Sequence, residues 1–204
     1  VDESVASAIG AGMRIDQPYG RMNIDIGGGR TNVSVFSFGH QIVWDILNVG
    51  GDRFDDAIID YLRKKHNLLI GARTAEELKI DIGSARMRGV KLEMDACGRS
   101  LVSGLPRAVT VSSEEMIEAL DEPLRDLMSA LHRMIERTPP ELASDIFDEG
   151  IILSGGGAQL FGLDGVISDQ LKIRTTLADE PDLCVAHGLS ELIDDEDKYE
   201  KISL

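Results

Sequence analysis

The sequence predicts an α/β protein made of two layers or subdomains. Its beginning alternates strands with tight turns, its middle combines helices with a small insertion of short strands, and its end places a strand and three glycines before further helices. This order of elements is typical of folds in which helices cover a sheet. Three glycines also follow the first predicted strand, so the two glycine turns are the leading candidates for a ligand site.

The composition limits what the chain can do. With 204 residues, of which 43% are hydrophobic, the chain is long enough for one large domain or two small ones. Its net charge of -15 argues against a nucleic-acid groove or a basic membrane-binding face. The charge does not exclude nucleotides, because a glycine turn binds phosphate through backbone dipoles and a metal ion.

The cysteines and the apolar runs indicate a cytoplasmic protein. Cys97 and Cys184 lie far apart with no CxxC pattern, as expected of free thiols in a reducing compartment. No apolar run approaches the roughly 20 residues of a membrane-spanning helix, and no signal peptide opens the chain. The sequence begins at Val1 without an initiator methionine, as if it were part of something longer.

The first elements expected along the chain are a short helix and a meander. The small, apolar run at 4–12 predicts a closely packed helix that ends at a glycine. Strands are then predicted at 22–26, 32–38 and 41–49. Because the turns between them are tight, the three strands are expected to form an antiparallel meander.

The first glycine turn has two possible explanations. Asp25 stands at the end of the first strand and is followed by Gly27, Gly28 and Gly29. Glycines leave backbone N–H groups bare and tolerate positive φ, so the turn can wrap around phosphate oxygens while the carboxylate serves their metal ion. A tight β-hairpin with an aspartate cap explains the same residues, and the turn alone does not choose between the two.

Two helices are predicted in the middle of the chain. The first opens at Gly50-Gly51-Asp52 and ends near Lys65, with acids first and bases last, as the helix dipole favours. The second is predicted to start from a capping box with Thr74 as N-cap and Glu77 three residues on. It would bury Ala75, Leu78, Ile82 and Ala85.

The remaining elements alternate between strands and helices. Short strands are expected at 90–94 and 108–111, and a long helix at 112–136, which Pro123 would kink or divide and Pro139-Pro140 would end. A strand at 150–154 precedes the second glycine turn. A helix to about Leu171, a strand at 174–177, a helix at 183–193 and an acidic, disordered tail at 194–204 are expected to follow.

Five segments in one register then point to a family. They are DIGGG at 25–29, GGDRFD at 50–55, IGSA at 82–85, PPELASD at 139–145 and GGGA at 155–158. Together with the small run at 6–12, they resemble the MreB family of bacterial actin homologues, which determine rod shape. The resemblance runs from about Glu3 to Ile193 and covers only the second half of that fold, so the first phosphate loop is not in this chain.

The resemblance implies an actin/Hsp70-like ATPase fold with a ribonuclease H-like core. Residues 1–50 and 114–193 would form the larger subdomain, and residues 51–113 an inserted smaller one. The implied cofactors are ATP and Mg²⁺, and the implied partners are a second copy or a full-length homologue and the cell-wall synthesis machinery, with no nucleic acid. The implied location is the cytoplasm, at the inner face of the membrane, although the family's own lipid contacts lie in the absent half.

The resemblance also assigns roles to individual residues. Asp25 would hold Mg²⁺ through water, Glu3 would position the attacking water, and Glu76 and Lys79 would line the adenosine. The residues implied to contact the nucleotide in the two turns are Gly27, Gly28, Gly29, Thr31, Gly155, Gly156, Gly157 and Ala158. Each has a plainer alternative: Glu3 as a helix N-terminal acid, Glu76 and Lys79 as a surface ion pair, and the second glycine turn as a packing turn.

One departure from the family pattern bears on catalysis. Arg30 follows the triple glycine, where the family has a threonine hydroxyl implicated in hydrolysis. A guanidinium can pair with phosphate but cannot orient a water in the same way. Whether the chain is an enzyme is therefore open, and slow or absent hydrolysis is expected.

Three functions remain open. The first is a nucleotide-binding, filament-forming cell-shape protein of the MreB type. The second is a non-enzymatic actin-like interaction module that no longer binds nucleotide. A sugar kinase of the same superfold is the weakest alternative, because no sugar-site constellation is visible. With half of each contact surface and a charge of -15, the chain by itself is expected to be a monomer or a small oligomer.

Overall fold

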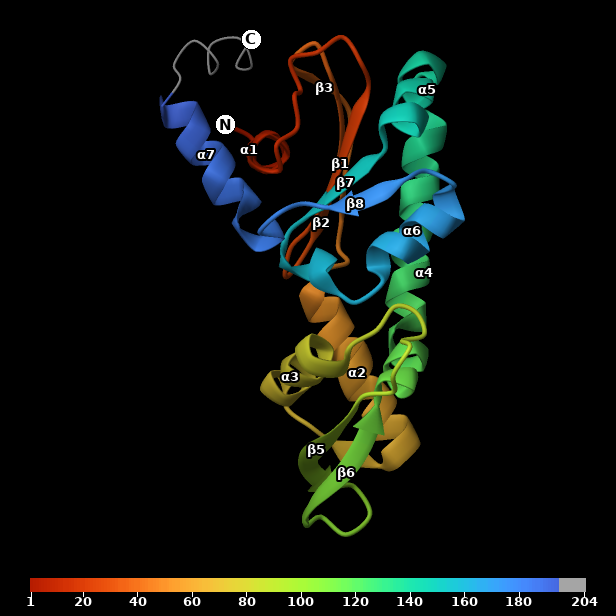
Figure 1. The fold of residues 1–204 in the computed structure, drawn as a ribbon. Coiled ribbons are helices and arrows are strands. Elements are labelled where there is room, and N and C mark those ends of the chain that lie inside the picture. Colours follow the sequence, from red (N-terminus) through yellow and green to blue (C-terminus); the bar gives the residue numbers. More distant parts are fainter. Residues whose placement is uncertain (195–204) are drawn as a thin grey trace.

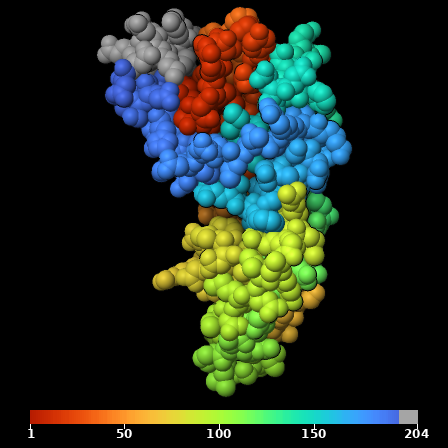
Figure 2. Space-filling model, viewed as in Figure 1, coloured from red at the N-terminus to blue at the C-terminus, as the bar shows by residue number. Residues whose placement is uncertain are grey.

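The computed structural model describes residues 1–194, which form two lobes (Figure 1). The predicted acidic tail lies outside the described residues, apart from Asp194, which ends the last helix. A five-stranded sheet with the order β3-β2-β1-β7-β8 lies in the larger lobe, and a three-stranded sheet with the order β4-β5-β6 lies in the smaller one. Figure 2 shows the smaller lobe as the narrower, yellow and green part of the surface. The predicted subdomain boundaries at 50/51 and 113/114 stay a prediction.

The predicted meander is confirmed. β1 (Arg21–Ile26), β2 (Thr31–Ser37) and β3 (His40–Leu47) pair antiparallel in chain order. On the other side of β1, β7 (Ile151–Ser154) pairs in parallel, and β8 (Thr175–Leu177) pairs in parallel with β7. Because β1 and β7 run in the same direction, the glycine turn that follows each strand emerges at the same edge of the sheet.

Helices cover both faces of the large sheet (Figure 1). α1 (Glu3–Gly10) and α7 (Cys184–Asp194) lie on one side. α4 (Ser113–Arg137), α5 (Pro140–Glu149) and α6 (Leu163–Leu171) lie on the other. None of these helices, nor any other among residues 1–194, is both long and apolar enough to cross a membrane.

The small residues of the first helix allow α1 and α7 to pack closely. A Cβ atom at Gly10 would lie 1.8 Å from the carbonyl oxygen of Cys184, and one at Gly188 would lie 1.8 Å from that of Ala6. Real Cβ atoms do not approach backbone so closely, so only glycine fits at these two positions. The predicted closely packed helix at the start of the chain is therefore confirmed.

The smaller lobe contains α2 (Gly51–His66), β4 (Leu68–Leu69) and α3 (Ala72–Ile82). β5 (Glu93–Ser100) and β6 (Pro106–Ser112) form its hairpin. α4 runs along this lobe and up the larger one (Figure 1). The buried stripe of α3 is confirmed at Ala75, Leu78 and Ile82.

Four details differ from the sequence predictions. The N-cap of α3 is Gly71 rather than Thr74, so the predicted capping box does not form there. The first strand of the hairpin begins at Glu93 rather than at 90. α4 passes through Pro123 without dividing, and α5, which was not predicted, begins at Pro140, because the first helical position needs no N–H donor.

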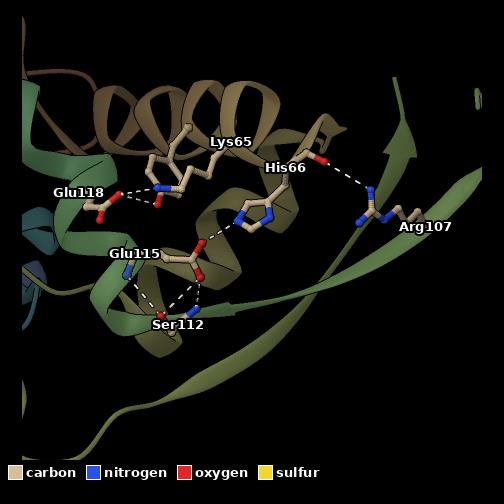
Figure 3. Close-up of polar contacts among 7 residues, drawn as sticks. Lys65, His66, Arg107, Ser112, Glu115 and Glu118 are labelled. Carbon is tan, nitrogen blue, oxygen red and sulfur yellow. Dashed lines mark hydrogen bonds and ion pairs between the residues drawn. The ribbon is translucent and has the colours of Figure 1, made fainter. Parts of the chain in front are cut away.

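Side chains fasten the C-terminal end of α2 to the N-terminal end of α4 (Figure 3). The Nε2 atom of His66 lies 2.6 Å from Oε1 of Glu115, whose other oxygen accepts from the backbone N–H of Ser112 in a capping box. One turn further along α4, Glu118 accepts from the hydroxyl of Tyr61 at 2.9 Å and from Lys65 at 3.3 Å. We call these six residues the α2–α4 clasp.

Candidate functional site

A cavity of about 610 Å³ lies where the two lobes meet. Parts of both glycine turns, the start of α2 and one face of α3 form its wall. The predicted site residues that line it are Gly27, Gly28, Glu76, Lys79, Gly156 and Gly157. The fold therefore brings residues from four distant parts of the sequence to one cavity.

The first glycine turn is held against the N-terminal end of α2. The carbonyl oxygen of Gly27 accepts from the N–H of Gly51 at 2.9 Å, and that of Gly28 accepts from the N–H of Asp52 at 2.8 Å. A Cβ atom at Gly50 would lie 2.5 Å from the Gly28 oxygen, so a side chain there would separate the helix from the turn. Close packing of α2 against the first glycine turn therefore explains why residue 50 is a glycine.

The same turn offers free donors. Among the described residues, the N–H groups of Gly28 and Gly29 donate to no protein acceptor. Successive unpaired amides in a turn form a concavity that binds anions. The turn can therefore accept phosphate oxygens through its backbone alone.

The second glycine turn lies directly against the first strand. Gly155 has φ +83°, and a Cβ atom there would lie 2.3 Å from the carbonyl oxygen of Ile26. At Gly157 a Cβ atom would lie 2.6 Å from a side-chain carbon of Ile26. Both positions need glycine for close packing, which agrees with the alternative that this is a packing turn. Gly156 and Gly157 also line the cavity.

Asp25 lies behind the turns rather than in the cavity wall. Its side chain is buried, and a Cβ atom at Gly155 would be 2.6 Å from its Oδ1 atom. Burial raises the pKa of Asp25, and the negative charge of Glu3 raises it further, against hydrogen bonds from Ser7, Asn32 and Ser154. A buried carboxylate with a perturbed pKa is a candidate functional group, because a bound cation would favour its ionised form.

Glu3 and Arg30 contact each other at a different place. The Nη2 atom of Arg30 donates to Oε2 of Glu3 at 2.7 Å, and Nδ2 of Asn32 donates to the same oxygen at 3.2 Å. These residues line a separate cavity of about 450 Å³, together with Trp44 and Asp45 of β3. The structure thus places the predicted catalytic acid against the residue that departs from the family pattern.

Lys79 has a partner that the sequence did not reveal. Its Nζ atom lies 2.9 Å from Oδ2 of Asp55 and donates to the carbonyl oxygen of Gly51 at 3.1 Å. The surface pair between Glu76 and Lys79, the plainer alternative, does not form. Burial raises the pKa of Asp55 although Lys79 lowers it, and Oδ1 of Asp55 is buried without a partner.

Three further predicted residues do not line the cavity. Thr31 is fully buried and its hydroxyl donates to the carbonyl oxygen of Val49 at 2.6 Å. Ala158 is buried in the core behind the second turn. Gly29 lies beside Asp52, which itself lines the cavity. Their predicted contacts with nucleotide stay predictions.

Magnesium would have to be held by few protein ligands. Within residues 1–194, no three His, Cys, Asp or Glu side chains lie close enough to bind a metal ion by themselves. Mg²⁺ usually keeps several waters and binds one or two carboxylates together with substrate phosphates. A single carboxylate at Asp25, behind the first glycine turn, fits that donor set.

Comparison with known structures defines the class of protein. The crystal structure of MreB5 of Spiroplasma citri bound to ADP matches 98% of this chain and 60% of its own, with a TM-score of 0.94 and 36% identity. The same protein bound to AMPPNP matches equally well, at a TM-score of 0.94. A MamK double helical filament, only 18% identical, matches with a TM-score of 0.78 and therefore shows the fold alone. The fold is that of the actin-like proteins.

Sequence comparison defines the family. Residues 1–201 match the model of the MreB/Mbl protein family. The chain is 43% identical to the cell shape-determining protein Mbl of Bacillus subtilis, covering 100% of this chain and 61% of that protein. It is 44% identical to the cell shape-determining protein MreB of Escherichia coli K12 over 92% of this chain and 54% of that protein. The chain belongs to the MreB/Mbl family, as its motifs predicted, and spans little more than half the length of these relatives.

Proposed function

We propose that the chain binds ATP and Mg²⁺ between its two glycine turns, as part of a filament-forming protein that determines cell shape. The cavity between the lobes is the observation that carries this proposal. Its volume of about 610 Å³ is in the usual range of small-ligand sites, and Gly27, Gly28, Gly156 and Gly157 leave backbone on its wall.

The phosphates would bind at the first glycine turn. The free N–H groups of Gly28 and Gly29 would donate to their oxygens, and the ammonium group of Lys79 lies on the same cavity wall. Because the chain carries a net charge of -15, its overall electrostatic field repels the anionic phosphates, and these few donors have to overcome that repulsion. Bound Mg²⁺ would supply the positive charge that offsets the phosphates, with Asp25 as its protein carboxylate.

Hydrolysis by this chain would be slow. A carboxylate that orients an attacking water needs an oxygen free to accept from that water. Oε2 of Glu3 already accepts from Arg30 and Asn32, which holds the carboxylate in one orientation and leaves only Oε1 to accept from a water. Arg30 would thus restrict the predicted catalytic acid, and the chain would be better suited to holding nucleotide than to cleaving it.

Self-association of the larger protein through the two ends of this part would build the filament, whereas the chain by itself would stay a monomer or a small oligomer. The β5–β6 turn at the bottom of Figure 1 exposes Leu101, Val102 and Leu105. Phe38, in the β2–β3 turn at the opposite end, is also exposed. Apolar side chains at opposite ends favour a head-to-tail contact, which does not close and therefore extends into a filament. We place this assembly in the cytoplasm, at the inner face of the membrane, with the cell-wall synthesis machinery as its partner.

Titration with a fluorescent ATP analogue, with and without Mg²⁺, tests the nucleotide part. We expect saturable binding that Mg²⁺ strengthens, and weaker, Mg²⁺-independent binding by Asp25→Asn. Asp121→Asn, on the exposed side of α4, is the matched control and should bind like the unchanged chain. If no binding saturates below millimolar analogue, the chain is an interaction module of this family that no longer binds nucleotide.

Phosphate release tests the catalytic part. We expect little release from ATP by the unchanged chain and more by Arg30→Thr, in which Glu3 loses its guanidinium partner. Arg125→Thr removes the same charge from an exposed pair with Asp121 and should change nothing. Equal rates for Arg30→Thr and the unchanged chain would contradict the inhibitory role of Arg30.

A further inference from the structure

A positively charged loop lies on the surface of this strongly negative chain. Residues 84–90, between α3 and β5, include Arg86 and Arg88 and no acidic residue, whereas the whole chain has a net charge of -15. Among residues 1–194, no carboxylate lies within ion-pair distance of either arginine. We call residues 84–90 the arginine loop. Its two positive charges are left without an acidic partner.

The arginine loop is fixed against the turn that precedes α6. The N–H of Ala85 donates to the carbonyl oxygen of Phe161 at 2.9 Å, and Ser84 pairs with Phe161 in an isolated parallel bridge. The Nε atom of Arg88 donates to the hydroxyl of Ser84 at 2.6 Å, and its guanidinium carbon lies 4.0 Å from the centroid of the Phe161 ring. Because the loop is already ordered, a partner that binds it need not supply the free energy of ordering it.

Arg86 extends over the first turn of α6. A Cβ atom at Gly162 would lie 2.6 Å from Cγ of Arg86, and one at Gly165 would contact its guanidinium. The N-terminal end of a helix carries a partial positive charge, so the charge of Arg86 adds to that of the helix instead of offsetting it. Since Arg86 is also exposed, the surface around it is positive and open to a partner.

Exposed apolar side chains lie in and beside the arginine loop. Met87, between the two arginines, is 66% exposed, and Val90 is 72% exposed. Ile80, in the last turn of α3 before the loop, is 69% exposed. Arginine clusters recognise acidic segments, and exposed apolar side chains gain from being covered. The loop therefore suits a segment that has both acidic and apolar residues.

The end of the chain has this composition. Residues 194–204 contain five acidic residues and two lysines, together with Tyr199, Ile202 and Leu204. α7, which ends at Asp194, lies on one side of the large sheet, and α6, which holds the arginine loop, lies on the other (Figure 1). A tail from the same chain would have to pass around the sheet to reach the loop, so a second copy is the better source.

We propose that the arginine loop of one copy binds the acidic tail, residues 194–204, of a second copy. Tail carboxylates would pair with Arg86 and Arg88, because a guanidinium binds a carboxylate through two parallel hydrogen bonds. The apolar tail residues would cover Met87 and Val90. The contact joins different surfaces of the two copies, so it can continue from copy to copy. It adds to the end-to-end contact proposed above and does not require nucleotide.

Sedimentation of the purified chain over a range of concentrations, at low salt, tests the proposal. We expect small oligomers that dissociate on dilution and at high salt. Asp195→Asn, Glu196→Gln and Asp197→Asn together should weaken association about ten-fold. General repulsion between copies of net charge -15 predicts the opposite sign, because removing negative charge would strengthen association.

A matched control removes three acids that are exposed elsewhere. It combines Asp126→Asn, Glu136→Gln and Asp148→Asn, on α4 and α5. These changes reduce the net charge as much as the tail variant does, but they leave the tail and the arginine loop intact. Association of this control should be no weaker than that of the unchanged chain.

Changes in the loop should act in the same direction as those in the tail. Arg86→Glu should weaken association about ten-fold, and Met87→Ser gives an independent result if Arg86→Glu does not fold. Arg133→Glu, the same charge reversal on the exposed side of α4, should not weaken it. A mixture of Arg86→Glu, which keeps its tail, with the tail variant, which keeps its loop, should give one-to-one dimers and no larger species.

The outcomes separate this inference from the proposed function. If the unchanged chain is a monomer at every concentration, the inference is wrong and nucleotide binding is unaffected. If the tail variant still forms oligomers, another surface carries self-association and only this inference is wrong. Loss of association in the tail variant, but not in Arg86→Glu or Met87→Ser, would place the tail elsewhere and also overturn the proposal. Thermal unfolding of each variant shows whether its fold is intact.

Discussion

The two ends of α2 are built in opposite ways. At its N-terminal end, glycines and backbone amides meet the first glycine turn, and Oδ1 of Asp55 is buried without a partner. At its C-terminal end, the α2–α4 clasp pairs His66 and Tyr61 with carboxylates of α4 (Figure 3). An incompletely satisfied end is typical of a ligand site, and a satisfied end is typical of a structural joint. The difference assigns binding to one end of the helix and stability to the other.

The environments of the acids at the two ends support this division. Burial raises the pKa of Asp55 at the cavity end, in spite of Lys79. In the clasp, hydrogen bonds from Tyr61 and Lys65 lower the pKa of Glu118. The environment at the cavity end therefore disfavours the ionised form of Asp55, which costs stability. The environment in the clasp favours the ionised form of Glu118.

Removal of Lys79 should give the largest effect at the cavity end. Lys79→Met would leave the Asp55 carboxylate buried and unpaired, because the side chains of both residues are only 13–14% exposed. We expect the free energy of unfolding to fall by about 3 kcal/mol and binding of the ATP analogue to be lost. Chemical denaturation and the analogue titration measure the two effects.

Two variants sharpen that prediction. Asp55→Leu combined with Lys79→Met removes both charges and should recover most of the stability but not the binding. Lys91→Met breaks an exposed pair with Glu93 and should change neither. If the double variant is no more stable than Lys79→Met, the buried pair is not the cause.

A side chain at Gly50 should give the next largest effect. Gly50→Ala would place a carbon 2.5 Å from the carbonyl oxygen of Gly28 and push α2 away from the first turn. We expect a loss of about 2 kcal/mol, and a weaker affinity for the analogue because the turn is displaced. Gly89→Ala, with no atom within 4 Å of the added carbon, is the matched control. An unchanged affinity in folded Gly50→Ala would contradict the role of this contact in binding.

A change in the α2–α4 clasp should lower the stability of the fold without changing nucleotide affinity. Glu115→Ala removes the acceptor for His66 and for the Ser112 N–H of the capping box. We expect unfolding to be easier by about 1.5 kcal/mol, which is roughly 3–6 °C in Tm for a chain of this size. The affinity for the ATP analogue should stay within about two-fold, a change below 0.5 kcal/mol. A large loss of affinity would show that the two ends of α2 are coupled.

Local pattern predicted the elements at both ends of α2 but not their long-range contacts. The glycine runs at 27–29 and 155–157 and the alternation of the first strands are visible in a short window, and the turns and the meander were predicted from them. The pairing of Lys79 with Asp55, 24 residues away, depends on how two helices pack. Helical spacing offered only Glu76 as a neighbour, and the same limit hid the contact between Arg30 and Glu3.

Capping signals were ambiguous for a different reason. The pattern at Thr74 and Glu77 resembles a capping box, yet α3 begins earlier, at Ala72. The box forms instead at Ser112 and Glu115, within a helix that the sequence did predict. A cap contributes only about 1 kcal/mol, so tertiary packing overrides it. α5 had a usable signal, Pro140 at its first position and Gly150 at its end, that was interpreted only as the end of α4.

The smallest effect, and the one of opposite sign, is expected behind the glycine turns. Burial and the charge of Glu3 raise the pKa of Asp25 in the folded chain above its ordinary value of 3.8. Between those two pKa values the folded state binds more protons than the unfolded state. Without metal, stability should therefore fall as the pH rises through this window and stay low at neutral pH.

Asp25→Asn removes this titration, so the metal-free variant should be more stable than the unchanged chain at pH 7 and similar to it well below pH 3.8. Urea denaturation across this pH range, with EDTA present, measures the difference. Asp121→Asn on exposed α4 should leave the pH profile unchanged. If Asp25→Asn is less stable at pH 7, the aspartate serves the fold rather than a cation.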